Sequence, residues 1–298
     1  MELTINDIRK VLILGSGTMG LRIGLQTALS GFDTTIYDIH EKAFISARKI
    51  QESILKNLVG NQVITPEDVA SSKARISFTT DPEAAAKDCD FVSESVLEEP
   101  DIKKEVWSIF SKLCPAHAVF TTNTSYLMPS MFAKETGRPE RFCAFHFHDV
   151  FQANVVDIMP HATTEKWIIG FLMDMGARLK QTPVIVKKES PGYIFNSMLV
   201  ALIGAAGALV TSEISSVEDV DRSWMGNFKM ATGPFGILDA IGLDTAWHVT
   251  NALPDARSKK FAALLKTYVD AGKLGQKTGE GFYTYPHPKF SQKDFVNK

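Results

Sequence analysis

The sequence predicts an α/β protein with an N-terminal doubly wound, mostly parallel sheet followed by an all-α C-terminal domain. Short apolar runs alternate with segments of helical periodicity over about the first 190 residues, a pattern typical of a parallel sheet covered on both faces. After Pro191 the strand-like runs stop and only helical segments with glycine breaks remain. A charged stretch meets Pro191-Gly192 at this change, so we expect domains over residues 1–188 and 189–298.

Each element is predicted from its hydrophobic period and its flanking glycines or prolines. The expected strands are residues 10–14, 34–38, 75–79, 90–96, 118–122, 142–147, 155–159 and 184–187. The expected helices of the first domain are residues 18–30, 41–58, 81–87, 102–113 and 165–175. Those of the second domain are residues 194–211, 217–225, 235–250 and 259–271.

Composition excludes several classes of function. The net charge is -2, which leaves no basic excess to neutralise a phosphate backbone, so nucleic acid is not an expected partner. Residues 194–210 are apolar and almost long enough to cross a membrane. Asn196, Ser197 and two glycines interrupt this stretch, and we therefore expect a buried helix and no membrane span.

The three cysteines and the N-terminus bear on location. Cys89, Cys114 and Cys143 are odd in number and far apart, without a CxxC pair, so neither a disulfide framework nor a thiolate metal site is predicted. The first ten residues are polar and lack the basic start and apolar stretch of a secretory signal. We expect a cytoplasmic protein.

A glycine-rich loop follows the first predicted strand. Gly15-Ser16-Gly17-Thr18-Met19-Gly20 matches G-x-G-x-x-G between a strand and a helix, the setting of a Rossmann-type dinucleotide site. The first glycine makes the tight turn, the second lets the backbone approach a pyrophosphate, and the third permits close helix packing. The unpaired N–H groups at the helix N-terminus favour the phosphate charge.

Asp38 closes the second predicted strand, about 20 residues after the loop, where a carboxylate can accept hydrogen bonds from ribose hydroxyls. The same charge repels a 2′-phosphate, and no arginine follows directly. The predicted cofactor is therefore NAD rather than NADP.

Several motifs together resemble the L-3-hydroxyacyl-CoA dehydrogenase family. They are the glycine loop, Asn123-Thr124-Ser125, His146-Phe147, the run PGYIFN from Pro191 to Asn196, GPFG from Gly233 to Gly236, and the C-terminal KLGQKTGEGFY from Lys273 to Tyr283. The similarity covers nearly the whole chain. It implies a homodimer formed through the helical domain, with apolar residues 194–210 and 261–265 at the interface.

The resemblance assigns catalytic roles to Ser125, His146 and Asn196. A neutral imidazole is suited to take the proton that leaves an alcohol as hydride leaves its carbon, so His146 is the predicted base. Ser125 and Asn196 can hydrogen-bond the reacting oxygens. Alone, a histidine at a strand end is more often a structural residue, and the motif is what distinguishes His146 from the six other histidines.

The sequence departs from the family at the fourth catalytic residue. The family's HFFNP reads His146-Phe147-His148-Asp149-Val150, and its LVE reads Val155-Val156-Asp157, with one residue fewer between the motifs. Asp157 is the candidate carboxylate that orients His146, one methylene shorter than the family glutamate. Its alternative is an ordinary polar strand residue. By the same resemblance Glu98, Lys103 and Lys277 contact the cofactor and Ser53 touches CoA.

The leading functional hypothesis is NAD-dependent oxidation of an (S)-3-hydroxyacyl-CoA to the 3-oxoacyl-CoA, in fatty-acid oxidation or short-chain acid metabolism. One alternative is a dehydrogenase of a free hydroxy acid, as in relatives that act on gulonate or carnitine. Another is a non-catalytic NAD-binding protein, which the altered loop after His146 would allow. His146 and His148 fall on one face of a strand, but no further ligand cluster is evident in the sequence, so no metal site is expected.

Overall fold

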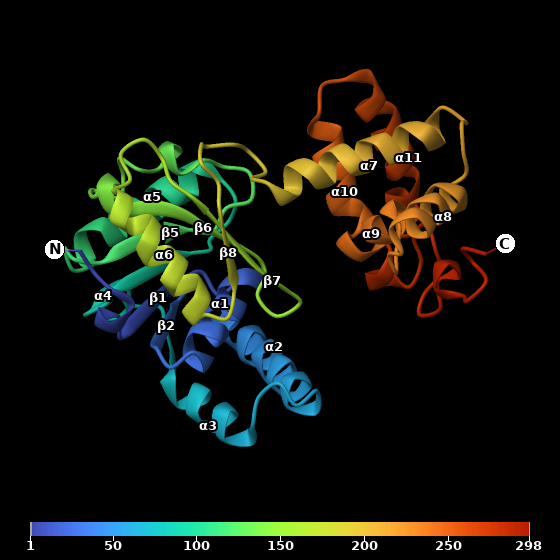
Figure 1. Cartoon of the computed structure of the whole chain (residues 1–298). Coiled ribbons are helices and arrows are strands. Elements are labelled where there is room, and N and C mark those ends of the chain that lie inside the picture. The colour runs from blue at the N-terminus through green and yellow to red at the C-terminus, as the bar shows by residue number, and fades with distance from the viewer. Residues whose placement is uncertain (1, 298) are drawn as a thin grey trace. The chain divides into compact units, whose positions relative to one another are not determined.

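The computed structural model describes residues 2–297 and divides into two compact units, residues 1–194 and 195–298. The division falls six residues after the predicted boundary. The first unit is an eight-stranded sheet with helices on both faces, as expected, and the second is helical (Figure 1). Among the described residues, no helix has the length and apolar character needed to cross a membrane.

The sheet has the strand order β3-β2-β1-β4-β5-β6-β7-β8. Every neighbouring pair is parallel except β6 and β7, which are antiparallel. The strands are β1 (Lys10–Leu14), β2 (Asp33–Tyr37), β3 (Ile76–Thr79), β4 (Phe91–Glu94), β5 (Val119–Thr122), β6 (Phe142–Asp149), β7 (Ala153–Met159) and β8 (Thr182–Ile185). All eight predicted strands are present, with ends shifted by a few residues.

The helices of the first unit are α1 (Thr18–Leu29), α2 (Glu41–Gly60), α3 (Pro66–Arg75), α4 (Pro82–Ala86), α5 (Pro100–Leu113) and α6 (Lys166–Arg178). Helix α3 was not predicted. Its sequence is polar and buries only Ser72, so it lacks an apolar stripe, but Thr65 and Asp68 form a capping box at its start with Pro66 in the first turn.

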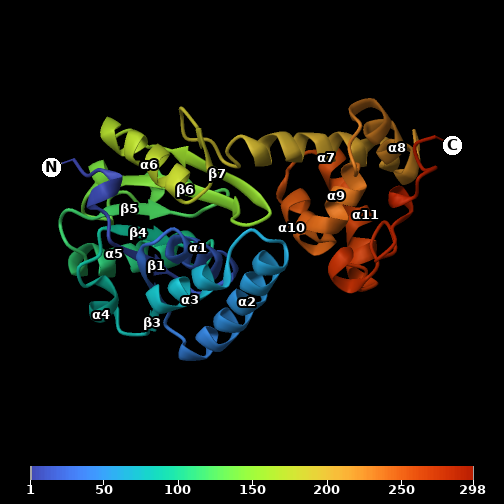
Figure 2. The ribbon, with the colours of Figure 1, turned by 60° about the horizontal axis from the view of Figure 1, so that its bottom comes forward.

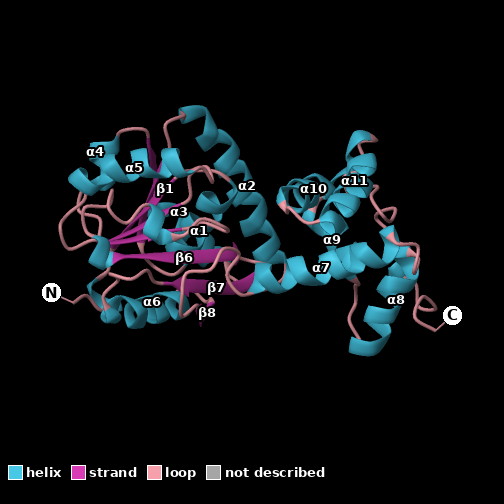
Figure 3. Ribbon diagram, turned by 90° about the horizontal axis from the view of Figure 1, so that it is seen from above, coloured by secondary structure: helices cyan, strands magenta, loops and turns pink. Residues whose placement is uncertain are grey.

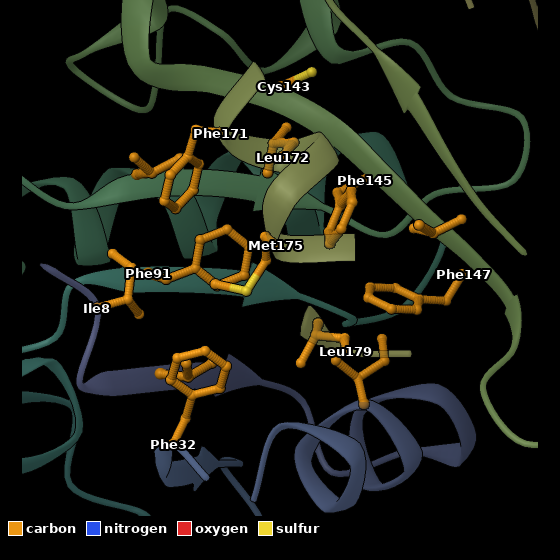
Figure 4. Close-up of a cluster of buried hydrophobic side chains, with 14 of the residues drawn as sticks. Ile8, Phe32, Phe91, Cys143, Phe145, Phe147, Phe171, Leu172, Met175 and Leu179 are labelled. Carbon is orange, nitrogen blue, oxygen red and sulfur yellow. The ribbon is translucent and has the colours of Figure 1, made fainter. Parts of the chain in front are cut away.

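Side chains alternate between the two faces of the sheet and build two cores. One core joins Ile13, Phe91 and Phe145 to α1 and α6 (Figure 4). The other core lies on the opposite face, where Leu12, Val92 and Phe120 pack against α5. Helix α5 contributes the fully buried Trp107. Figure 2 shows α1 and α6 beside the strands, and Figure 3 shows β6 and β7 lying next to each other. The helices cover the two faces of the sheet. The carboxyl ends of the parallel strands are where polar side chains can gather.

The second unit contains α7 (Phe195–Thr211), α8 (Val217–Phe228), α9 (Pro234–Ile241), α10 (Leu243–Ala252) and α11 (Ala256–Asp270) around a core that includes Phe235 and Phe261. The prediction of one helix over residues 235–250 was wrong. Gly242 has φ +101°, outside the helical region, and this separates α9 from α10. Glycine suits the position, because a Cβ there would crowd Asp244 and Lys277.

Candidate active site

The glycine loop connects β1 to α1 and is shaped by close backbone contacts. Gly15 has φ +98°, and a Cβ there would lie 2.7 Å from the carbonyl oxygen of Ser95. A Cβ on Gly20 would lie 1.9 Å from the carbonyl oxygen of Gly15. The space that a Cβ on Gly17 would enter is open. The first and third glycines therefore serve the fold, while Gly17 leaves the loop clear at the N-terminus of α1, which suits a pyrophosphate.

Asp38 lies directly after β2 and is bound to the same loop. Its Oδ2 accepts hydrogen bonds from the Ser16 N–H at 2.8 Å and the Ser16 hydroxyl at 2.6 Å, and its Oδ1 accepts from the His40 N–H at 3.0 Å. The carboxylate is only partly buried. Its position beside an open glycine loop fits a dinucleotide whose ribose hydroxyls need an acceptor.

Three of the predicted catalytic residues meet near the ends of β5 and β6. Ser125 follows β5, His146 lies in β6, and Asp157 is paired with His146 in the antiparallel register of β7. The His146 Nδ1 lies 3.3 Å from Asp157 Oδ2, and its Nε2 lies 3.2 Å from Ser125 Oγ. His146 is 3% exposed and Asp157 1%. The carboxylate thus holds one ring nitrogen while the other points to the serine hydroxyl.

The electrostatics of this pair favour a neutral imidazole beside an ionised carboxylate. Burial lowers the pKa of His146, and hydrogen bonding to Asp157 only partly offsets it. For Asp157, burial opposes ionisation, but hydrogen bonds from His146 and His148 outweigh it and the pKa falls below its ordinary value. A neutral His146 with its proton on Nδ1 has a free electron pair on Nε2, the arrangement of a general base.

Glu98 holds the turn that carries Ser125. It accepts hydrogen bonds from the backbone N–H groups of Ser125 at 2.8 Å and Tyr126 at 3.1 Å, and from the Thr124 hydroxyl. Burial opposes its ionisation, but the charge of Lys103 and these hydrogen bonds lower its pKa. Glu98 was predicted from the resemblance as a cofactor contact, and in the structure its carboxylate is engaged by the protein's own turn.

Lys103 is fully buried and forms an ion pair with the fully buried Glu94, with 2.7 Å between Lys103 Nζ and Glu94 Oε1. Glu94 also accepts hydrogen bonds from the Thr122 hydroxyl and the Val96 N–H. Glu94 was not among the residues predicted from the sequence. The available signal was a carboxylate at the end of a short strand that begins with Phe91 and Val92, where burial would require a partner.

His148 and Tyr193 also border His146, and neither was predicted as a site residue. The Tyr193 ring stacks on the His146 ring with 4.7 Å between centroids. His148 Nε2 lies 2.9 Å from Asp157 Oδ2. His146, His148 and Asp157 are thus three groups whose polar atoms lie within 4.8 Å of one another, although no further ligand cluster beside the two histidines was evident in the sequence. Hydrogen bonds to the shared carboxylate account for this arrangement.

The remaining predicted residues are Ser53, Asn196 and Lys277. Ser53 is on α2, where it lines a cavity of about 750 Å³ together with Arg22 and Lys49. Asn196 is in the first turn of α7, and Lys277 forms an ion pair with Asp244, both in the second unit.

The doubly wound sheet and its glycine loop define the class of Rossmann-type dinucleotide-binding proteins. Comparison with known families narrows this class. Residues 10–190 match the NAD-binding domain of 3-hydroxyacyl-CoA dehydrogenase, and residues 192–285 match its C-terminal domain. The chain belongs to the 3-hydroxyacyl-CoA dehydrogenase family, which makes it an NAD-dependent oxidoreductase.

Individual relatives agree over nearly the full length. The chain is 30% identical to 3-hydroxybutyryl-CoA dehydrogenase from Clostridioides difficile, over 93% of this chain and 99% of that protein. Among solved structures, (S)-3-hydroxybutyryl-CoA dehydrogenase from Ralstonia eutropha is 29% identical with a TM-score of 0.84, over 94% of this chain and all of the other. A diketoreductase that catalyses reactions of dicarbonyl compounds is 35% identical with a TM-score of 0.88, over 93% of this chain and 99% of that one.

Proposed function

We propose that this protein interconverts an (S)-3-hydroxyacyl-CoA and the corresponding 3-oxoacyl-CoA, with NAD as the hydride acceptor and His146 as the base. The family membership supports the reaction, and one observation supports the residues. His146 stands between Ser125 and Asp157, with a different ring nitrogen facing each of them. Such a histidine can accept a proton at Nε2 without losing its orientation.

The proposed role of His146 begins with a neutral ring. Nδ1–H donates a hydrogen bond to Asp157, and Nε2 accepts the substrate hydroxyl proton as the alcohol becomes a ketone. NAD, when bound, would supply the acceptor for the hydride that leaves the hydroxyl-bearing carbon. The imidazolium that results is stabilised by the adjacent carboxylate, which stays ionised because its pKa is low.

Ser125 is proposed to hydrogen-bond the reacting oxygen, since its hydroxyl already lies beside His146 Nε2 and its backbone is fixed by Glu98. Asn196 is proposed from the resemblance to bind the substrate as well. Glu98, Lys103 and Lys277 remain proposed as cofactor-site residues. The fully buried Lys103 would act indirectly, through its ion pair with Glu98, which holds the Ser125 turn.

Ser53 is proposed to contact CoA. It lines the cavity along α2 together with two cationic side chains, Arg22 and Lys49, and with several amides. Cationic and amide groups suit the phosphates and the polar chain of CoA. Arg22 is also paired with Asp149, one of the residues that depart from the family motif, with 2.7 Å between Arg22 Nη1 and Asp149 Oδ2.

The test is NADH oxidation by the purified protein, followed by absorbance, with acetoacetyl-CoA and free acetoacetate supplied in parallel. We expect turnover with the CoA ester, abolished in His146→Gln and unaffected in His287→Gln, which changes an exposed histidine of the second unit. Turnover with free acetoacetate alone would contradict the CoA requirement. No turnover with either compound, despite NADH binding, would contradict the proposed reaction.

A second candidate is the reduction of a dicarbonyl compound that carries no CoA. It is favoured by the diketoreductase, whose identity of 35% exceeds the 29% of the Ralstonia eutropha enzyme. A simple diketone such as 2,4-pentanedione in the same assay separates the two. Efficient reduction of the diketone, with no gain from the thioester, would favour this candidate.

We further propose that the protein is a homodimer and works in the cytoplasm. Helix α7 is almost entirely apolar yet buries only Ile203, Ala206 and Gly207, while Met198 is 61% exposed. Such a face is typical of a subunit interface. Light scattering after gel filtration should give twice the chain mass, and Met198→Glu should reduce it. The three buried, unpaired cysteines suit a reducing compartment, which cell fractionation can test.

A further inference from the structure

We propose that His148 is a positioning residue for the reaction: it shares the carboxylate of Asp157 with His146 and thereby sets the orientation of the base. This inference rests on the proposed function of His146. Asp157 Oδ2 accepts from His148 Nε2 at 2.9 Å and from His146 Nδ1 at 3.3 Å, so one oxygen serves both rings. The shorter hydrogen bond belongs to His148.

The strand geometry explains how both rings reach one carboxylate. His146 and His148 are two residues apart in β6 and therefore lie on the same face of the sheet. Asp157 stands opposite His146, and the register between β6 and β7 shifts between Phe147 and Asp149, so the ladder is irregular at His148. Such irregularities redirect side chains. The two imidazole rings lie 4.7 Å apart between centroids.

The short side chain of Asp157 explains why a second donor, His148, is needed. An aspartate reaches less far than the glutamate of the family motif, and its contact with His146 is correspondingly long. A second donor fixes the carboxylate in the plane where it can still accept from His146 Nδ1. Without that donor the carboxylate would be free to rotate, and the preferred tautomer of His146 would be lost. His148 and Asp157 replace the family's phenylalanine and glutamate as a pair.

His148 also affects the charge around the base. The titratable groups that act on His146 are Asp157 and His148, which contact it, and Glu98, with the Tyr193 ring stacked on the imidazole. Burial is the largest cause of the lowered pKa of His146, and the electrostatic interaction with His148 lowers that pKa further. Replacing His148 by a neutral residue should therefore shift the acid limb of the kcat/KM profile to higher pH.

The experiment compares His148→Phe, which removes the donor, with His148→Gln, which keeps an uncharged donor. We expect His148→Phe to lower kcat about 10-fold with little change in KM, because misplacement of a reacting group costs rate more than binding. His148→Gln should retain kcat within about threefold while its acid limb moves to higher pH. The double variant His148→Phe/Asp157→Glu rebuilds the family pair and should be faster than either single variant.

Three results would overturn the proposal. Wild-type kcat and an unchanged pH profile in His148→Phe would show that His148 only fills space in the core. Equal losses in the Phe and Gln variants would show that the donor is irrelevant, and a double variant no better than the single variants would show that the two positions are uncoupled.

A measurement without turnover separates this inference from the proposed reaction. Imidazole nitrogen NMR on the resting protein reads the His146 tautomer directly. We expect the Nδ1–H form in the wild type and in His148→Gln, and a mixture in His148→Phe. If acetoacetyl-CoA is not a substrate, this result still decides whether His148 positions His146, and an unchanged tautomer in His148→Phe would contradict it.

Discussion

Both units bury carboxylates, but they surround them with different partners. In the first unit, the buried Asp157 is bound by two histidines, while Glu98, whose side chain is 40% exposed, faces Lys103. In the second unit, Asp221 accepts from the N–H groups of Phe235 and Gly236 at the start of α9 and from the Tyr283 hydroxyl. Asp239 likewise accepts from two backbone N–H groups and the Tyr285 hydroxyl.

The pKa directions follow the partners. Hydrogen bonds from the histidines, or the charge of a lysine, outweigh burial and lower the pKa of Asp157 and Glu98. For Asp221 and Asp239, burial dominates over neutral donors and the pKa is raised. A buried carboxylate beside titratable side chains can stabilise a charge that changes during a reaction. A buried carboxylate beside backbone and tyrosine donors holds segments of the chain together.

Asp157→Asn should break this comparison most clearly. An amide cannot stabilise the imidazolium and allows the wrong His146 tautomer, so we expect kcat to fall about 1000-fold. The melting temperature should also fall, because the ionised carboxylate contributes stability through its two histidine donors. Steady-state kinetics and calorimetry on one preparation measure both. A kcat within tenfold of the wild type would show that Asp157 has no role in catalysis.

Asp221→Asn should lower stability without affecting catalysis. The new NH2 group would face N–H and hydroxyl donors, leaving buried groups unpaired at a cost of about 2–3 kcal/mol in the free energy of unfolding. Urea denaturation measures this loss, and kcat per folded molecule should stay near the wild-type value. Asp270→Asn, at an exposed ion pair with Lys266, is the control and should change stability by less than about 0.5 kcal/mol. Equal effects of the two variants would refute the structural role of Asp221.

Asp38→Asn sharpens the comparison, because Asp38 has backbone and serine partners but remains partly exposed. We expect the KM for NAD to rise about tenfold with kcat nearly unchanged, since binding of the ribose is weakened equally in the ground and transition states. Discrimination against NADP should weaken because the repelling charge is gone. Initial rates with both cofactors test this, and an unchanged KM for NAD would exclude Asp38 from the cofactor site.

Acidification should affect the two units in opposite senses. The pKa of Asp157 and Glu98 is lowered from 3.8 and 4.5, so the stability they contribute is present above those values and is lost as the pH falls through the lower, folded-state pKa. For Asp221 and Asp239 the pKa is raised from 3.8, so their contribution is full below 3.8 and is lost as the pH rises. Hydrogen exchange between pH 5 and 3 should show protection falling first around β6 and β7, and simultaneous loss in both units would contradict this.

Local patterns predicted much of the fold. The period of apolar residues identified all eight strands and most helices, since burial on a sheet or against a helix imposes that period on neighbouring residues. Helix α3 was not predicted because its capping box, and not an apolar face, marks it as a helix. The break at Gly242 was not predicted because glycine also occurs within helices. Only its positive φ separates α9 from α10.

The site divides in the same way. The sequence by itself indicated the glycine loop and Asp38, whose chemistry depends on a contiguous turn and one strand. Its family motifs identified Ser125, His146, Asp157 and Asn196 as candidates. Only the tertiary structure decided which groups face His146. The register of β6 and β7 brings Asp157 opposite His146 and lets His148 share its carboxylate. Packing between β4 and α5 pairs Glu94 with Lys103. Strand spacing determines the face on which a side chain lies, but its partner across the sheet depends on a register set by the whole chain.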